Sequence, residues 1–365
     1  MRRVLHVIDS LHLGGAQEVI LNIVAGSTRY SHEVATLHGE GIYWDRLKLL
    51  KVPVHSLSPH KAVPIYVPNL IRLLWSGRFD ILHCHLIASN LIAKPIGAAL
   101  RVPVIINHDH TNAPDRASNR SLLTAEKIAN RFATHVIAVS QSCRTFLIEH
   151  ERLAPSDVTL IWNAIDTARF EPGEGSRSAA RSSLGIAEDD FLIIGVGRLN
   201  AQKNFLRFLD VIGELRRARP HVRAFIAGNG PEESALRQRI ESGGLRDVVR
   251  LLGYTADPRP LYLAADALLM PSRFEGLPMT LLEAMAMRVP VVASRLDGMA
   301  EVVSHGTDGF LCASDSDFVA ALRGLADEPG LRDRIGAAAR SKILGHFTAA
   351  RMVREIEDIY DRFLQ

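Results

Sequence analysis

The sequence has little of what stabilises a disulfide-rich or metal-organised domain. Only 3 of its 365 residues are cysteine, and Cys84, Cys143 and Cys312 lack the paired spacing of a metal site or a disulfide framework. No apolar run approaches the roughly 18 residues of a membrane-spanning helix. The start, MRRVLHVIDS, passes at once into a strand pattern without the apolar region of an export signal. We therefore expect a cytoplasmic protein with reduced thiols, whose membrane contact is at most peripheral, at the inner face of the membrane.

The chain also lacks a strong charge of either sign. Lys and Arg number 43 and Asp and Glu 40, a formal net charge of +3, so we expect no nucleic-acid partner. Residues 1–170 contain 18 basic against 13 acidic side chains, or +5, and the remainder contains 25 against 27, or −2. Such an excess ordinarily marks a solvated surface. The alternative is a mildly basic face for an anionic membrane or acceptor. The basic residues expected on this face, in loops and on helix faces of the first domain, are Lys61, Arg72, Arg78, Arg116 and Arg120.

The glycine fingerprint of dinucleotide binding is absent as well. An expected first strand at 4–8 is followed by Gly14-Gly15 and an amphipathic helix, a unit that can bring a phosphate to a helix N-terminus. A tight turn explains two glycines equally well. Because the spacing is not G-x-G-x-x-G, a nicotinamide dehydrogenase is disfavoured.

What the sequence does contain is a long alternation of strands and helices. A chain of 365 residues exceeds what one core usually fills, so two domains are expected. The alternation predicts an α/β fold with parallel sheets wound on both faces, in which ligands bind at the carboxyl ends of the strands. By composition the best linker is Glu171–Ser176, and 108–119 is expected to be a polar loop. The strands are expected at 4–8, 33–37, 52–57, 80–85, 102–107, 135–139, 158–162, 191–196, 222–227, 248–252, 267–270, 289–293 and 309–311.

The stretch around which the chain is organised is Pro271–Glu301. It follows the expected strand at 267–270, and Pro278 with the good helix formers after it predicts a helix start. Glu275 then lies in a loop at the carboxyl end of a strand, and Glu283 lies inside the helix. The unpaired N–H groups of a helix start favour an anionic ligand such as a nucleotide phosphate. Two glutamates eight residues apart are otherwise a capping or surface pair.

A second motif combines glycine with two cations. The expected strand at 191–196 runs into GRLNAQKN, residues 197–204, and a helix follows. Arg198 supplies a fork of donors and Lys203 a point charge, which together with a helix N-terminus suit a diphosphate. Isolated surface cations are the alternative.

These motifs resemble those of the retaining GT-B glycosyltransferases of family 4. Glu275 and Glu283, within FEGLP…LLEA, are similar to the Glu-x7-Glu motif of that family, and 197–204 resembles its Gly-Arg…Lys-Asn motif. The resemblance implies two Rossmann-like doubly wound domains facing across a cleft. It implies an acceptor-side domain at 1–170, a donor-side domain at 171–347 and a C-terminal helix at 348–365 that crosses back to the first domain. Ala164 departs from the family pattern, which has glycine there.

The resemblance also implies roles for single residues. Glu275 is expected to contact the donor sugar and Glu283 the ribose, while His110, which follows the strand PVIIN, is expected to lie beside the sugar and to be catalytic with Glu275. The donor-binding residues it implies are Gly14, Gly15, Arg198, Lys203, Gly253, Tyr254, Gly276, Leu277 and Glu283. The histidines at 83, 85, 108 and 110 cluster at the carboxyl ends of two expected strands. A metal site is the alternative for them, but no carboxylate-rich motif accompanies them.

The function that the resemblance implies is retaining transfer of a sugar from a nucleotide-diphosphate sugar to a glycan or lipid-linked acceptor, in cell-surface polysaccharide synthesis. No cofactor and no metal are expected, because Arg198 and Lys203 supply positive charge and no Asp-x-Asp triplet follows a strand. A nucleotide-sugar epimerase of the same two-lobed architecture and a non-enzymatic bilobal sugar-binding protein remain alternatives.

Overall fold

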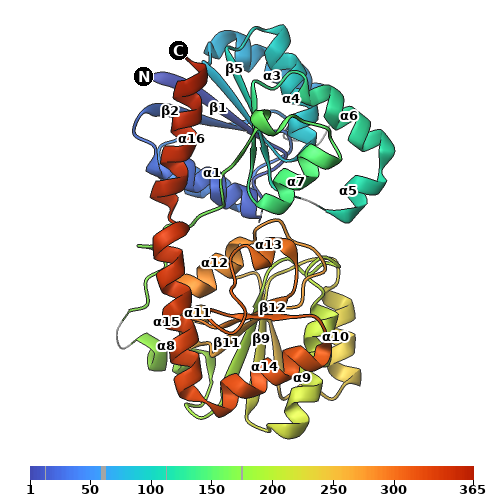
Figure 1. Ribbon diagram of the computed structural model, residues 1–365, viewed down its shortest axis with the longest axis vertical. Coiled ribbons are helices and arrows are strands. Elements are labelled where there is room, and N and C mark those ends of the chain that lie inside the picture. The colour runs from blue at the N-terminus through green and yellow to red at the C-terminus, as the bar shows by residue number, and fades with distance from the viewer. Residues whose placement is uncertain (13, 59–62, 112, 174–175) are drawn as a thin grey trace. The chain divides into compact units, whose positions relative to one another are not determined.

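The computed structural model describes residues 1–12, 14–58, 63–111, 113–173 and 176–365. The chain divides into two compact units (Figure 1). Unit 1 comprises Met1–Ile165 and Ala349–Gln365, and unit 2 comprises Asp166–Thr348. Each unit is built around one parallel β-sheet, as the alternation of strands and helices predicts.

The sheet of unit 1 has seven parallel strands in the order β3-β2-β1-β4-β5-β6-β7. The first strand therefore lies inside the sheet, and the chain moves outward first to one side and then to the other. The direction changes between β1 and β4, and the carboxyl ends of two such strands frame the usual ligand crevice of doubly wound sheets. The strands are β1 Arg2–Ile8, β2 Tyr30–Thr36, β3 Val54–Ser56, β4 Ile81–His85, β5 Val104–Asp109, β6 His135–Ala138 and β7 Val158–Leu160.

Helices cover both faces of this sheet. Leu5, Val7, Leu82 and Ile105 point to one face and form an apolar core with residues of the third and fourth helices. The neighbouring positions along the strands point to the other face. The helices of unit 1 are α1 Gly15–Gly26, α2 Ile42–Leu49, α3 Val63–Gly77, α4 Ile87–Ala99, α5 Pro114–Ser118, α6 Arg120–Asn130, α7 Gln141–Glu149, the 3₁₀ helix η1 Pro155–Asp157 and α16 Ala349–Phe363.

Unit 2 repeats the arrangement with six parallel strands in the order β10-β9-β8-β11-β12-β13. Its first strand, β8, pairs with β9 on one side and with β11 on the other, so the change of direction falls between β8 and β11. The strands are β8 Phe191–Val196, β9 Val222–Ala227, β10 Val249–Gly253, β11 Ala267–Met270, β12 Val291–Ser294 and β13 Phe310–Cys312. The helices are α8 Ser176–Leu184, α9 Phe205–Ala218, α10 Glu233–Ser242, α11 Arg259–Ala264, α12 Met279–Ala286, α13 Asp297–Ala300, α14 Asp315–Asp327 and α15 Pro329–His346.

The C-terminal helix α16 belongs to unit 1, where it packs beside α1. Its apolar stripe is buried, including Ile356 and Tyr360. Glu357 extends from the same helix and accepts hydrogen bonds from the hydroxyl of Ser27 at 2.6 Å and from Nε of Arg29 at 2.7 Å. Apolar burial and a charged clamp therefore both attach the end of the chain to its beginning.

The boundary between the units differs from the expected one by five residues. Residues 166–170 were expected in the first domain, but the structure places them in unit 2. Phe170 is buried against Tyr262, and its carbonyl oxygen accepts a hydrogen bond from Arg340 at 3.1 Å. The segment expected as a linker, 171–176, therefore lies within unit 2, and residues 174–175 are outside the described part of the chain.

Several elements were not predicted from the sequence. The expected polar loop at 108–119 contains the short helix α5, and the helices α2, α8, α11 and α13 were also missed. Among the described residues, no helix is long and apolar enough to cross a membrane. The three cysteines are buried and unpaired by disulfides.

Candidate functional site

Two loops of unit 2 lie side by side because their strands are neighbours. One loop, 197–204, joins β8 to α9, and the other, 271–278, joins β11 to α12. The backbone N–H of Arg273 donates to the carbonyl of Gln202 at 2.8 Å, and the side chain of Asn204 donates to the carbonyl of Pro271 at 3.3 Å. The two motifs singled out in the sequence are thus hydrogen-bonded to each other. The N-termini of α9 and α12 follow these loops, at the edge of the sheet where a phosphate is favoured.

The two loops are also joined by an ion pair. Nζ of Lys203 lies 2.6 Å from Oε1 of Glu275, and the amide of Gln202 donates to Oε2 of the same carboxylate at 3.2 Å. The side chain of Glu275 is 5% exposed and that of Lys203 16%. Taking a carboxylate out of water is costly unless it is paired. The pairing with Lys203 therefore fixes the Glu275 side chain within this edge of the sheet.

Glycines let the neighbouring backbones approach closely. Gly197 and Gly228 both have φ +151°, and a β-carbon added at Gly228 would lie 1.8 Å from the carbonyl oxygen of Gly197. A β-carbon at Gly298 would lie 1.8 Å from the carbonyl oxygen of Gly276. No side chain fits at either contact, so this part of the edge is lined by backbone.

Glu283 is positioned by a residue that sequence reasoning missed. Its Oε2 accepts a hydrogen bond from the hydroxyl of Tyr262 at 2.8 Å, and Tyr262 is fully buried in α11. Burial, with the nearby Glu283 carboxylate, raises the pKa of Tyr262 well above its usual value, so the hydroxyl stays protonated and donates. Leu277, just before α12, is buried, whereas Arg198 is exposed on the first of the two loops.

Gly253, the last residue of β10, and Tyr254, which follows it, lie at the same edge of the sheet but farther out. Gly253 has φ +72°, a left-handed conformation that favours glycine, and its carbonyl accepts a hydrogen bond from the N–H of Gly228 at 2.8 Å. Through Gly228 this turn is connected to the loop that begins at Gly197. Unit 2 therefore brings together the predicted residues Arg198, Lys203, Gly253, Tyr254, Glu275, Gly276, Leu277 and Glu283.

The other predicted residues lie in unit 1. Gly14 and Gly15 begin α1, and a β-carbon at Gly14 would lie 2.4 Å from Oε1 of Gln17. Gln17 in turn donates to the carbonyl of Ser10 at 2.8 Å, which fixes the turn between β1 and α1. His110 directly follows β5.

A row of histidines covers the face of the unit 1 sheet opposite the apolar core. His6 and His83 are register partners, as are His85 and His108, and His32 pairs with Val4, two residues before His6. His110 continues the row and stacks on His108 with ring centroids 4.4 Å apart. Burial lowers the pKa values of His6, His83, His85 and His108 well below the usual value and those of His32 and His110 to about 4. At neutral pH these side chains are uncharged.

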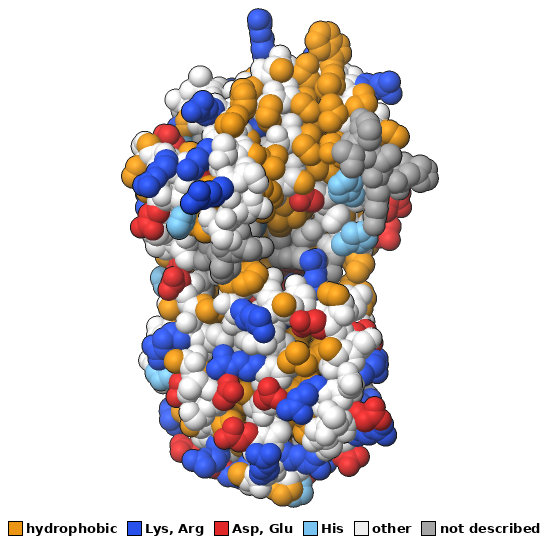
Figure 2. All heavy atoms as spheres, turned by 90° about the vertical axis from the view of Figure 1, so that its right-hand side faces the viewer, with side chains coloured by type: hydrophobic (Ala, Val, Ile, Leu, Met, Phe, Trp, Pro, Cys, Tyr) orange, Lys and Arg blue, Asp and Glu red, His pale blue; other side chains and the backbone are white. Residues whose placement is uncertain are grey.

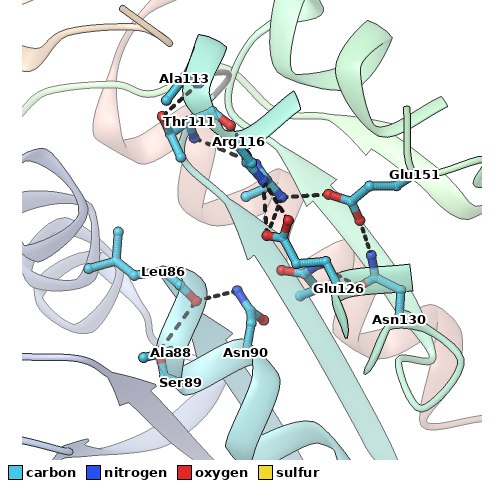
Figure 3. A network of polar contacts seen from close by, with 12 residues as sticks. Leu86, Ala88, Ser89, Asn90, Thr111, Ala113, Arg116, Glu126, Asn130 and Glu151 are labelled. Atoms are coloured by element: carbon cyan, nitrogen blue, oxygen red, sulfur yellow. Dashed lines mark hydrogen bonds and ion pairs between the residues drawn. The ribbon is translucent and has the colours of Figure 1, made fainter. Parts of the chain in front are cut away.

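Beside His110 lies a pocket that contains a buried ion network (Figure 3). Figure 3 shows Arg116 of α5 at its centre, with the carboxylates of Glu126 and Glu151 directed toward it. Arg116 donates to Asp109 at 2.6 Å, to Glu126 at 2.9 Å and to Glu151 at 2.6 Å. The sequence had placed Arg116 on an exposed basic surface with Arg72 and Arg120, and that prediction is wrong, because Arg116 is 4% exposed.

The network extends to a buried lysine. Nζ of Lys94 donates to the side-chain oxygen of Asn130 at 2.5 Å, and the amide of Asn130 donates to Glu151. Burial lowers the pKa of Lys94 to about 8 and raises that of Glu151 to about 8. The signal in the sequence was a lysine in the otherwise uncharged helix α4. The pocket thus offers polar groups next to His110 in a largely dry environment.

Comparison with known families agrees with the motifs. Residues 13–169 match the family model described as Glycosyltransferase Family 4, and residues 176–342 match the one described as Glycosyl transferases group 1. Together these matches span nearly all of both units.

Similar proteins and structures share this architecture. A lipopolysaccharide core biosynthesis mannosyltransferase, LpsB of Rhizobium meliloti, is 31% identical over 342 residues, 86% of this chain and 92% of the relative. A UDP-Gal:alpha-D-GlcNAc-diphosphoundecaprenol alpha-1,3-galactosyltransferase of Escherichia coli is 26% identical over 301 residues, 80% of this chain and 78% of the relative. The structure of Anabaena Alr3699/HepE in complex with UDP-glucose superposes with a TM-score of 0.90 at 22% identity, covering 99% of this chain and 100% of that one. The fold is GT-B, as expected.

The first prediction concerns Arg116. In the Arg116→Leu variant, three carboxylates lose their shared cation, so we expect the free energy of unfolding of unit 1 to fall by about 3–5 kcal/mol. All three tryptophans, Trp44, Trp75 and Trp162, lie in unit 1, so urea unfolding followed by tryptophan fluorescence reports on this unit. The matched control is Arg120→Leu at the exposed start of α6, with an expected change within about 0.5 kcal/mol. Equal stability of the two variants would contradict the structural role of the network.

The second prediction concerns pH. The buried histidines have lower pKa values in the folded than in the unfolded state, where the value is about 6.5. Below that pH the unfolded state binds more protons, so the stability of unit 1 falls as the pH falls from 6.5 toward 4. At pH 5.5, one pH unit below the unfolded pKa, each histidine lowers the free energy of unfolding by about 1.4 kcal/mol. Glu126 and Glu151 act in the opposite direction, because burial raises the pKa of each in the folded protein, but they are two groups against six.

The measurement is the urea midpoint of the tryptophan transition at pH 7.5 and at pH 5.5. We expect a clearly lower midpoint at pH 5.5. A midpoint that stays constant or rises would show that these histidines are not held neutral in the folded protein.

Proposed function

Because the chain belongs to the group 1, family 4-type glycosyltransferases, we propose that it is a retaining enzyme that moves a sugar from a nucleotide-diphosphate sugar to a glycan or lipid-linked acceptor in cell-surface polysaccharide synthesis. The observation that carries the proposal is the Lys203–Glu275 ion pair between the loops after β8 and β11. It places a cation and a buried carboxylate together at the point where doubly wound sheets bind ligands.

The diphosphate of the donor is proposed to bind at the loop 197–204. Arg198 and Lys203 supply positive charge, the glycine at 197 allows close backbone approach, and the N-terminus of α9 favours an anion. A diphosphate would compete with Glu275 for Lys203. Lys203 would then share its hydrogen bonds between Glu275 and the phosphate, and Glu275 would be free to turn toward the sugar that the phosphate carries.

Glu275 and Glu283 are proposed to act on different parts of the donor. The bond between the anomeric carbon and the diphosphate oxygen breaks as the bond to the acceptor oxygen forms, and the acceptor's proton leaves with the nucleotide diphosphate. Positive charge develops at the anomeric carbon in this step. A carboxylate held in a dry site stabilises this charge more than it stabilises the bound ground state. Glu283, oriented by Tyr262, is proposed to accept hydrogen bonds from the ribose. Gly253 and Tyr254 are proposed to bracket the nucleobase, and His110 to lie beside the sugar.

UDP-sugars are the donors we propose to test first. The Escherichia coli relative is named for transfer from UDP-Gal, and the Anabaena protein was crystallised with UDP-glucose. GDP-sugars are the second choice. No divalent ion is proposed, because Arg198, Lys203 and backbone N–H groups can offset the charge of the diphosphate.

The acceptor is proposed to bind on unit 1. Figure 2 shows hydrophobic side chains gathered on one face of this unit, with Lys and Arg side chains around them. On α3, Trp75 is 76% exposed and Ile71 40%, and Arg72 and Arg78 are exposed close by. Lys61, the remaining basic residue predicted for this surface, lies outside the described residues. Apolar anchors beside cations suit an anionic membrane that carries a lipid-linked acceptor.

The test of the function is a donor panel. Purified protein is incubated with UDP-, GDP- and ADP-sugars, with and without EDTA, and nucleotide release is measured with candidate acceptors. We expect release with one UDP-sugar, unchanged by EDTA, and an α-linked product from an α-linked donor in the anomeric proton NMR signal. Product without any acceptor would favour an epimerase, a β-linked product would exclude retention, and loss of turnover in EDTA that magnesium restores would exclude metal independence.

The third prediction separates the residues of the candidate donor site. Glu275→Gln keeps the shape of the side chain and removes its charge, so we expect kcat to fall by about 10²-fold or more. Lys203→Ala should raise the donor KM and also lower kcat, because it removes a phosphate contact and the partner of Glu275. Glu283→Gln, which still accepts from Tyr262, should chiefly raise the donor KM.

The matched control for these variants is Arg207→Ala. Arg207 forms an ion pair with Asp315 on the outside of α9, in the same unit, and its loss should leave the kinetics unchanged. Full activity of Glu275→Gln at unchanged stability would remove Glu275 from the reaction.

The fourth prediction concerns the membrane. Binding to vesicles that contain phosphatidylglycerol should weaken as the salt concentration rises, because cations near the surface are screened. The double variant Ile71→Ser/Trp75→Ser should reduce binding about tenfold or more, since it removes two apolar anchors. Phe132→Ser, an exposed aromatic residue elsewhere on unit 1, is the control. Equal binding of all three proteins would move the membrane contact away from α3.

A further inference from the structure

Four histidines of unit 1 are joined end to end. Nδ1 of His32 lies 2.9 Å from Nε2 of His6. Nδ1 of His6 lies 3.1 Å from Nε2 of His85, and Nδ1 of His85 lies 3.1 Å from Nε2 of His110. Every contact joins Nδ1 of one ring to Nε2 of the next. These four rings form a histidine chain with a single direction, from His32 on β2 to His110 after β5.

Such a chain has only two consistent proton arrangements. A neutral imidazole has one N–H and one lone pair, and each contact needs one of each. Either every Nδ1 donates to the next Nε2, or every Nε2 donates in the reverse direction. The tautomer of His110 is therefore tied to that of His32, three contacts away.

The buried end of the chain selects between these arrangements. Nε2 of His32 is buried and has no hydrogen-bond partner among the described residues. The charge of the Glu357 carboxylate acts to raise the pKa of His32, but this carboxylate accepts its hydrogen bonds from Ser27 and Arg29. If every Nε2 donated, His32 would leave an unpaired N–H in the interior. If every Nδ1 donates, it leaves only a bare lone pair, and buried unpaired N–H groups are the rarer case.

We propose that His32, His6 and His85 are positioning residues that hold His110 as a neutral imidazole with its proton on Nδ1. Nε2 of His110 is then occupied by His85, and its Nδ1–H is the group that remains for a ligand. The neighbouring Asp109 carboxylate instead accepts hydrogen bonds from Arg116 and from the N–H of Thr111. His110 thus presents an uncharged donor, and the ligand atom opposite it must be a hydrogen-bond acceptor. Resting on the proposed function, that acceptor is an oxygen of the donor sugar.

A metal ion explains the geometry less well. Two groups, His6–His83–His85 and His85–His108–His110, have one nitrogen of each ring within 4.8 Å of the others. However, His83 stacks on His85 with an interplanar angle of 24°, and His108 stacks on His110 at 27°. Lone pairs lie in the ring planes, so stacked rings direct their nitrogens side by side rather than toward one ion. Neither group includes a carboxylate that would offset the charge of a divalent ion.

The first test is ¹⁵N NMR of the ligand-free protein labelled at histidine, at pH 7. The His110 signals are identified by their loss in His110→Gln. We expect Nδ1 of His110 to have the shift of a protonated nitrogen and Nε2 that of an unprotonated one. The reverse assignment, averaged shifts from mixed tautomers, or zinc bound stoichiometrically with perturbed His85 signals would each overturn the proposal.

The second test reverses the direction of the hydrogen bonds along the histidine chain. In His32→Asp, a carboxylate oxygen takes the place of Nδ1 and can only accept, so every ring should turn its proton toward β2 and His110 should carry its proton on Nε2. In His32→Leu, His6 becomes the buried end with a bare Nε2, and the tautomer of His110 should stay as in the wild type. His135→Asn is the control, because His135 contacts Thr159 and lies outside the chain.

An unchanged His110 tautomer in folded His32→Asp, or a reversed one in His32→Leu, would contradict the coupling. If His32→Asp does not fold, the wild-type and His32→Leu spectra still show whether His110 carries its proton on Nδ1. Donor KM separates this inference from the proposed function. We expect it to rise about three- to tenfold in His32→Asp, the loss of one hydrogen bond. A reversed tautomer with unchanged KM supports the coupling and removes His110 from the donor sugar.

Discussion

The ion pair between Lys203 and Glu275 is the interaction on which the candidate donor site depends. It can form only because β8 and β11 are neighbours in the sheet, which brings loops some seventy residues apart in sequence to one edge. In the ligand-free protein the pair offsets the desolvation cost of the Glu275 carboxylate, which is 5% exposed. A diphosphate that engages Lys203 changes the surroundings of Glu275 at the same moment. Binding of the donor diphosphate to Lys203 and release of Glu275 from its ion pair therefore occur together.

Unit 1 has a different kind of polar interior. One side of its sheet carries neutral histidines in hydrogen-bonded chains, and beside His110 the Arg116 network holds three carboxylates around one guanidinium. In both arrangements most of the buried polar groups are paired with one another, and both end near the carboxyl edge of the sheet. They fix the position of His110 from two directions. The cost is sensitivity to acid, because protonating the histidine rows brings like charges together inside the unit.

Sequence reasoning found what local pattern encodes. Strand and helix alternation predicted both sheets, and Pro278, the glycine at 197 and the two glutamates identified the loops correctly. It missed contacts between residues that are far apart in the sequence. Tyr262 gave no local sign that it would meet Glu283, and Arg116 looked like a surface cation because its three acidic partners are spread from residue 109 to 151. The histidines were seen as a cluster at strand ends, but their end-to-end order follows from strand register, which the sequence does not display.

The central claim is that the donor binds to the paired loops of unit 2, and hydrogen–deuterium exchange with and without UDP tests it most directly. Ligand contacts slow exchange of the backbone amides that they order. We predict that UDP protects segments 197–204 and 271–283, with a smaller effect at 253–254, and that this protection is lost in Lys203→Ala. Saturating UDP that protects neither loop, or protects them equally in Lys203→Ala, would contradict the account.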